Sequence, residues 1–90
     1  MSRVRRSFQI VNTLGLHARA AAQLVQTANR YGSEIHVEKD GSEVNGKSIM
    51  GVLTLAAAKG SQVGVSCEGD DAEQAMTALA KLIENGFGET

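Results

Sequence analysis

The stretch Gly15-Leu16-His17-Ala18-Arg19-Ala20-Ala21 decides how the first half of this chain is organised. The alanines and the apolar residues that follow favour a helix, so His17 is predicted at its N-cap. The amides of Ala18, Arg19 and Ala20 then lie in the first turn and have no partner inside the helix. Together with the partial positive charge of the helix start and the Arg19 guanidinium, they form a site for a phosphate group. The imidazole of His17 supplies a nucleophile at the same place.

His17 also has an ordinary interpretation, because a single histidine near a helix start is usually a surface residue or an indifferent cap. Two features favour a functional role. The residues beside His17 are small or glycine, which leaves the ring accessible. A second helix start with a phosphate-compatible side chain follows at Gly46-Lys47-Ser48.

Alternating side chains and turn residues predict four strands and three helices. Strict alternation puts Ile35 and Val37 on the inner face of one strand and leaves His36 between two acids on the outer face. Asp40-Gly41 is a strong hairpin signal. The expected strands cover residues 7–11, 34–38, 43–45 and 62–68, and the expected helices run from His17 to about Arg30, from Ser48 to Leu53, and from Asp70 or Asp71 to about Gly86. This order predicts an α+β fold with helices on one face of an antiparallel sheet.

The end of the chain carries a further pair of expectations. Asp70 or Asp71 is predicted to cap the last helix, with Glu73 or Gln74 bonding back to the cap. Phe87 is placed in the tail beyond that helix.

Length and charge limit the functions that this chain could have. Its 90 residues are expected to form one domain, 1–90, without room for a second, catalytic one. Lys and Arg number 9 against 10 acids, which argues against nucleic-acid binding through bulk charge. Arg3, Arg5 and Arg6 are interpreted as a solvated N-terminal edge. The single cysteine, Cys67, is predicted to be a small core or strand residue, because the chain has no disulfide partner and no zinc-type spacing.

No targeting or membrane segment is recognisable. The N-terminal residues lack the continuous apolar stretch of a secretory signal, and no segment approaches the ~20 apolar residues that span a bilayer. We therefore expect a cytoplasmic protein without membrane insertion, and no metal or cofactor.

Two motifs together resemble the HPr family, the histidine-containing phosphocarriers of the bacterial phosphoenolpyruvate-dependent sugar phosphotransferase system. They are Gly15-Leu16-His17-Ala18-Arg19, continued by Ala20-Ala21, and Lys47-Ser48-Ile49-Met50-Gly51-Val52. The resemblance covers nearly the whole chain. One position departs from it, since the family usually has proline where this chain has Ala20. The fold implied is an open-faced β-sandwich, a four-stranded antiparallel sheet covered on one face by three helices.

The resemblance also implies a carrier instead of an enzyme. Enzyme I, charged by phosphoenolpyruvate, would pass a phosphoryl group to Nδ1 of His17, and the phosphorylated carrier would pass it to a sugar-specific IIA domain. Arg19 would stabilise the phosphate, and the backbone amides of Ala18 and Arg19 would contact it. The carrier is expected to be a monomer.

Ser48 carries a regulatory hypothesis beside its predicted role as a helix N-cap. In family members from lineages with an HPr kinase/phosphorylase, the matching serine is phosphorylated from ATP. This kinase and a transcriptional regulator are therefore further implied partners. A phosphate here would add about −1.5 to −2 charge at a helix start. The residues expected to dock partners beside His17 are Leu16, Ile49, Met50 and Leu53.

Three other interpretations are open. Residues 41–48, Gly-Ser-Glu-Val-Asn-Gly-Lys-Ser, satisfy the P-loop pattern, but Asp40-Gly41 predicts a hairpin and no magnesium-binding strand follows. The strand and helix order also matches RNA-recognition domains, but the chain lacks the aromatic residues on which bases would stack. Within the family, a paralogue serving nitrogen or carbon regulation would keep His17 and differ only in its partners.

Overall fold

The structure, a computed structural model, describes residues 2–89. Its elements, in chain order, are β1 (Ser2–Gln9), α1 (Ala18–Ala28), β2 (Glu34–Lys39), β3 (Ser42–Asn45), α2 (Ile49–Thr54), β4 (Gln62–Gly69), α3 (Ala72–Glu84) and the short 3₁₀ helix η1 (Gly86–Gly88). The predicted order of four strands and three helices is confirmed. Within residues 2–89, no helix is long and apolar enough to cross a membrane.

The four strands form one antiparallel sheet in the order β1-β4-β2-β3. Asp40 and Gly41 join β2 to β3 with φ values of 52° and 85°, as the hairpin signal predicts. This hairpin contradicts the P-loop interpretation, because Gly41 lies at the turn and Val44 lies in β3. A phosphate-binding loop would instead wrap between a buried parallel strand and a long helix.

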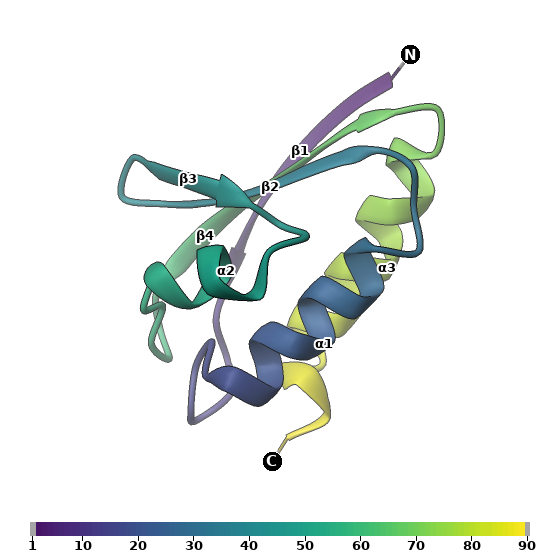
Figure 1. Cartoon of the computed structure of the whole chain (residues 1–90). Helices are drawn as coiled ribbons and strands as arrows, with labels where there is room; N and C mark the ends of the chain where they lie inside the picture. The colour runs from purple at the N-terminus through teal and green to yellow at the C-terminus, as the bar shows by residue number, and fades with distance from the viewer. Residues whose placement is uncertain (1, 90) are drawn as a thin grey trace.

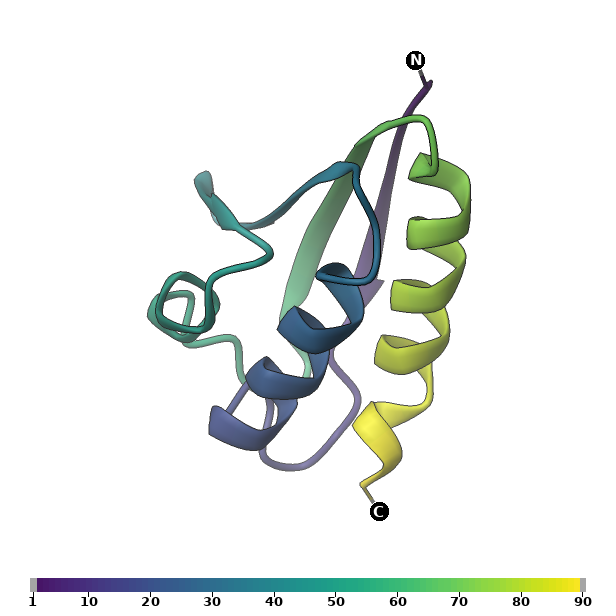
Figure 2. The same ribbon diagram turned by 45° about the vertical axis from the view of Figure 1, so that its right-hand side comes forward.

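One face of the sheet is covered and the other is open. Figures 1 and 2 show α1 and α3 side by side on the same face, with α2 beside them near β3. Alternation along the strands turns the paired side chains Phe8 and Val63, Val37 and Val65, and Ile35 and Cys67 toward the helices. They pack against the buried stripes of the two long helices, Ala20, Ala21, Leu24, Val25 and Ala28 of α1 and Ala72, Ala75, Met76, Leu79, Ala80 and Ile83 of α3.

The N-terminal arginines Arg3, Arg5 and Arg6 are all exposed on the edge strand β1, as the sequence interpretation of a solvated edge predicts, but the strand starts earlier than expected. β1 begins at Ser2 and includes all three. Arg5 pairs with Glu38 at 3.0 Å on the open face, and the Arg6 guanidinium lies 4.8 Å from the centre of the Phe8 ring. Cross-strand pairing with β4 is therefore strong enough to extend the strand through polar residues.

The end of the chain also differs from the prediction. Phe87 lies in the tail beyond α3, as expected, but its side chain is buried, at 2% exposure. Asp71 occupies the N-cap of α3, but its side chain makes no capping hydrogen bond. Its carboxylate instead accepts hydrogen bonds from the Gly32 and Ser33 amides, at 2.9 and 3.0 Å, and from the Ser33 hydroxyl. Asp71 thus ties the start of α3 to the segment between α1 and β2.

These bonds lower the pKa of Asp71, chiefly through the Ser33 hydroxyl and then the Gly32 amide. A carboxylate whose pKa is lowered by folding stabilises the folded state above its unfolded pKa and loses that effect as the pH falls through the folded pKa. We predict that Asp71→Asn lowers the melting temperature at pH 7, and that the difference from the wild type shrinks below about pH 4. Thermal unfolding monitored by circular dichroism across pH measures this. The matched control is Asp70→Asn, the exposed neighbour; a constant difference at all pH values would contradict the prediction.

Candidate functional site

His17 lies where a loop becomes α1, as predicted. Its backbone is extended, with φ −76° and ψ −179°, and its Nδ1 accepts a hydrogen bond from the Arg19 amide at 3.4 Å. The His17 carbonyl accepts a hydrogen bond from the Ala21 amide at 2.8 Å, and this bond begins the series of backbone hydrogen bonds in α1. The side chain is 27% exposed, so the ring is partly accessible to solvent.

The preceding loop is fixed by a contact with the segment that follows α2. The Leu16 amide donates to the Ala57 carbonyl at 2.8 Å. Gly15 has a φ of +66°, and a Cβ at this position would lie 2.4 Å from the Ala57 oxygen. Only glycine combines this conformation with so close a backbone approach. The contact with Ala57 therefore fixes the position of the loop backbone that carries His17.

The start of α1 offers the groups that an anion needs. Ala18 and Arg19 are both exposed, and their amides belong to the first turn, whose N–H groups lack intrahelical partners. Arg19 and His17 line a shallow depression of about 360 Å³, together with Thr13, Leu14, Gly88 and Glu89. A phosphoryl group attached to Nδ1 would therefore meet the positive end of the helix.

Sequence reasoning missed two residues at this site, Glu89 and Asn12. Glu89 Oε2 lies 2.5 Å from His17 Nε2, and Glu89 Oε1 accepts a hydrogen bond from Asn12 Nδ2 at 2.9 Å. The hydrogen bond from Asn12, followed by that from His17, lowers the pKa of Glu89, so the carboxyl is ionised at neutral pH. An acid 72 residues from His17 along the chain gives no local signal of this contact.

The two contacts of the imidazole define its tautomer. A backbone amide can only donate, so Nδ1 accepts and carries a lone pair. An ionised carboxylate can only accept, so Nε2 carries the proton. The arrangement thus presents Nδ1 as the nucleophilic nitrogen, on the side of the helix start.

Comparisons with known proteins agree with this geometry. The family model described as "PTS HPr component phosphorylation site" matches residues 4–85. The chain belongs to the HPr family of phosphocarrier proteins. Phosphocarrier protein HPr of Neisseria meningitidis serogroup A is 50% identical over 86 residues, which cover 96% of this chain and 97% of that protein.

Solved structures show the same fold. The crystal structure of HPr from Thermoanaerobacter tengcongensis is 51% identical, with a TM-score of 0.91, and covers 100% of this chain and 99% of that one. Crh of Bacillus subtilis, a catabolite repression protein seen as a dimer with a swapped domain, is 39% identical, with a TM-score of 0.74 and 97% coverage of both chains. HPr proteins carry phosphoryl groups and are not catalysts in the usual sense.

The second helix start has the predicted cap. The Ser48 hydroxyl accepts a hydrogen bond from the Gly51 amide at 3.0 Å. Beside it, Lys47 is not free to meet a phosphate in this structure, because its Nζ donates to the Tyr31 carbonyl at 2.7 Å. The cap thus forms part of the fold as well as a candidate site.

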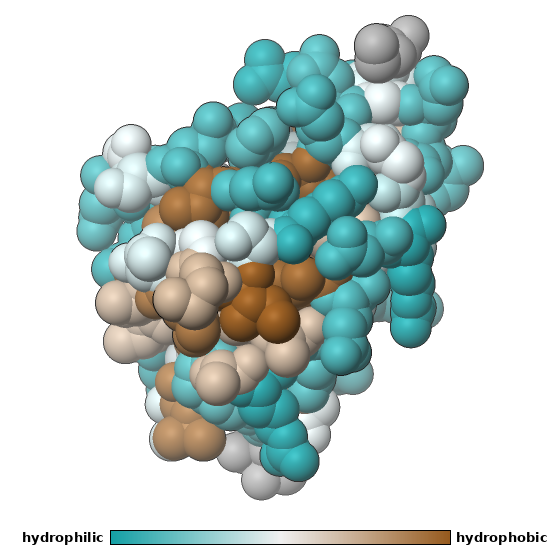
Figure 3. Space-filling model, in the orientation of Figure 1, coloured by the Kyte–Doolittle hydropathy of each residue, from teal (hydrophilic) through white to brown (hydrophobic). Residues whose placement is uncertain are grey.

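Apolar side chains gather beside these helix starts. Ile49 and Met50 are 42% and 73% exposed, and Leu53 is half-buried. Figure 3 shows the resulting hydrophobic surface over α2, bordered by hydrophilic residues above it and to its right. Leu16 does not belong to this surface, because it is buried in the core at 4% exposure. The expectation that Leu16 docks partners is therefore wrong.

His36 and Cys67 have the structural roles that the sequence predicts. His36 lies on the open face of β2, half-buried between its cross-strand neighbours Ser66 and Asn45. Cys67 is fully buried, and burial, with a smaller effect of the Asp71 charge, raises the pKa of its thiol to about 11.

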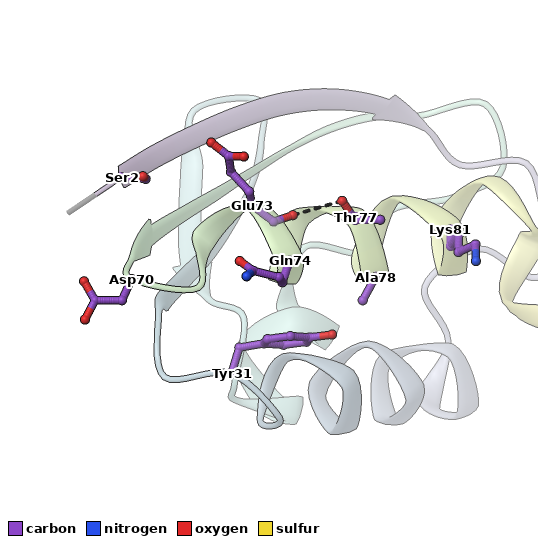
Figure 4. Close-up of a pocket in the computed structure, with 8 residues that line it drawn as sticks. All are labelled: Ser2, Tyr31, Asp70, Glu73, Gln74, Thr77, Ala78 and Lys81. Carbon is purple, nitrogen blue, oxygen red and sulfur yellow. Dashed lines mark hydrogen bonds between the residues drawn. The ribbon is translucent and has the colours of Figure 1, made fainter.

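A depression of about 710 Å³ lies far from His17, along α3 (Figure 4). Tyr31 lines it just beyond the end of α1, whereas His17 precedes the start of that helix. At about 1.5 Å per residue, the 11 residues of α1 separate the two places by roughly 16 Å. The depression therefore does not belong to the His17 site.

We predict that Gly15→Ala destabilises the protein more than Gly41→Ala does. Both glycines have a positive φ, and alanine in that conformation costs roughly 1–2 kcal/mol. Only at Gly15 would the added Cβ also collide with backbone, since nothing lies within 4 Å of the Cβ position at Gly41. Chemical denaturation of the two variants measures the difference. Equal losses of unfolding free energy in the two variants would contradict the prediction, because they would mean that the backbone at Ala57 moves aside at no energetic cost.

Proposed function

We propose that this chain accepts a phosphoryl group on Nδ1 of His17 from phospho-enzyme I and passes it to sugar-specific IIA domains. The observation that carries the proposal is the position of Nδ1, which faces the first turn of α1 and its Arg19 amide while Nε2 faces Glu89. The helix start, Arg19 and the backbone amides of Ala18 and Arg19 supply the electrostatic contacts for the phosphate.

The exposed position of the site suits a relay. Arg19 is exposed, so its guanidinium can contact the phosphate and then release it to a partner. The depression beside His17 is shallow, so a donor or acceptor protein can reach the phosphorus from solvent. The hydrophobic surface of Ile49, Met50 and Leu53 would dock these partners. As a cytoplasmic carrier, the protein would act as a monomer.

Regulation through Ser48 forms a second part of the proposal. An HPr kinase/phosphorylase would transfer phosphate to the Ser48 hydroxyl, which lies beside the exposed Ile49 and Met50. The added negative charge would disfavour docking of enzyme I, which brings an anionic phosphoryl group to the same face. The modified carrier would instead bind a transcriptional regulator.

A purely regulatory role is the second candidate function, favoured by the similarity to Crh over 97% of both chains. A growth experiment distinguishes the role in sugar uptake from the purely regulatory role. A deletion strain would fail to grow on a phosphotransferase sugar if the chain serves sugar uptake, and would grow normally if it serves only nitrogen or carbon control.

We predict that His17→Ala abolishes acid-labile labelling by enzyme I and labelled phosphoenolpyruvate. The variant should remain folded, because the lost cap bond is worth about 1 kcal/mol or less. His36→Ala, which removes the only other histidine of the sequence, is the matched control and should be labelled like the wild type. Labelling of His17→Ala would exclude the proposed acceptor.

We predict that Ser48→Asp slows phosphorylation of His17 by enzyme I a few-fold, since a surface charge changes a contact energy by up to about 1 kcal/mol. The melting temperature should be unchanged or slightly higher, because aspartate also caps helices and its charge favours a helix start. Ser48→Asn is the uncharged control. Identical enzyme I kinetics in Ser48→Asp and Ser48→Asn would remove the basis for charge-based regulation.

A further inference from the structure

We propose that Glu89 is a positioning residue that keeps the Nε2 proton on His17 through both phosphoryl transfers, and that Asn12 fixes the Glu89 carboxylate for this task. The inference rests on the proposed function of His17 and assigns to the segment after α3 a part in the chemistry of the site.

The backbone after α3 delivers Glu89 to the imidazole. Gly86, Phe87 and Gly88 have φ values of 62°, 57° and 74°, so three successive left-handed residues reverse the chain. The Phe87 ring is buried, and the Glu89 amide donates to the Gly86 carbonyl at 3.0 Å. Figure 1 shows this final segment, in yellow, ending next to the start of α1. A left-handed conformation is costly for phenylalanine, which indicates that burial of its ring holds the reversal in place.

Asn12 holds the carboxylate from a buried position. Its Nδ2 donates both to the Gly15 carbonyl, at 2.8 Å, and to Glu89 Oε1. Both partners only accept, so the orientation of the amide is determined. Asn12 is 3% exposed, and its Oδ1 has no partner among the described residues, which costs free energy. The side chain thus links the loop before His17 to Glu89 through its two donors, at the expense of an unsatisfied oxygen.

In the first transfer, His17 keeps the Nε2 proton that it donates to the Glu89 carboxylate. Neutral imidazole attacks through the Nδ1 lone pair, and the Nδ1–P bond forms as the bond from phosphorus to the donor breaks. The electron pair of that bond stays with the donor. His17 retains the Nε2 proton and becomes a phosphorylated imidazolium, whose positive charge the Glu89 carboxylate offsets across the existing hydrogen bond.

The second transfer depends on the same proton. The Nδ1–P bond breaks, its electron pair returns to Nδ1, and the phosphoryl group passes to the acceptor. With Nε2 protonated, the leaving group is neutral imidazole; without that proton it would be the far more basic imidazolate. The carboxylate lies on the Nε2 side of the ring, away from the phosphoryl group on Nδ1. It can therefore stabilise the ring charge without occupying the phosphate position.

The test uses the full chain with ¹⁵N-labelled histidine and the variant Glu89→Gln. In the wild type, ring ¹⁵N shifts should report a protonated Nε2 and a free Nδ1. In Glu89→Gln, the fraction with the proton on Nδ1 should rise. The rate of phosphorylation by enzyme I at saturation should fall about tenfold, as expected for loss of one charge-assisted hydrogen bond, with little change in KM. Glu84→Gln, which removes an exposed acid paired with Arg6, is the matched control and should behave as wild type.

A wild-type tautomer ratio or a wild-type transfer rate in Glu89→Gln would overturn the inference. A second variant, Asn12→Ala, should give the same tautomer change in smaller degree while Glu89 remains. The tautomer is measured on unphosphorylated protein, so it tests the role of Glu89 even if enzyme I fails to phosphorylate the wild type. That failure would instead reject the proposed function.

Discussion

The hydrogen bond from the Leu16 amide to the Ala57 carbonyl, 2.8 Å long, determines where α1 begins. Because Gly15 is packed against the same carbonyl, the loop cannot shift toward the segment after α2. Leu16 is then drawn into the core, and His17 is the first residue with its side chain at the surface. The burial of α1 and the orientation of the imidazole both follow from this attachment.

Small residues make that attachment compatible with close packing. Ala20 and Ala21 are fully buried immediately after the site, so the first turn of α1 lies close against the rest of the core. The family's usual proline is replaced at Ala20 without loss of the helix start, because the Ala21 amide still reaches the His17 carbonyl. A residue at this third helical position has no obligatory intrahelical bond to lose. Neither alanine nor proline at this position therefore costs an intrahelical hydrogen bond.

Local patterns were sufficient for much of the fold and for half of the site. The cap at His17, the cap at Ser48 and the hairpin at Asp40-Gly41 each depend on residues within a few positions, and all three are confirmed. Glu89 could not be predicted, because its contact with His17 depends on the chain reversal after α3. The burial of Phe87 depends on the same reversal.

The other errors also come from contacts that are distant in sequence. Asp71 is of a residue type that caps helices and lies at the N-cap of α3. Its carboxylate accepts hydrogen bonds from the amides of residues 32 and 33 instead of from the first turn of the helix. The extension of β1 through its arginines depends on pairing with β4, more than 50 residues away. Leu16 was expected at a surface because it adjoins His17, whereas the contact with Ala57 turns it inward.

The reversal at Gly86–Gly88 has a practical consequence for attaching labels and fusion partners. Glu89 contacts the imidazole directly, so any segment joined behind it emerges beside the reactive ring. The start of β1 lies at the opposite end of the molecule in both ribbon views. A fluorophore or affinity peptide placed before Ser2 would thus leave the approach of partner proteins clear, whereas one placed behind Glu89 would stand in their path.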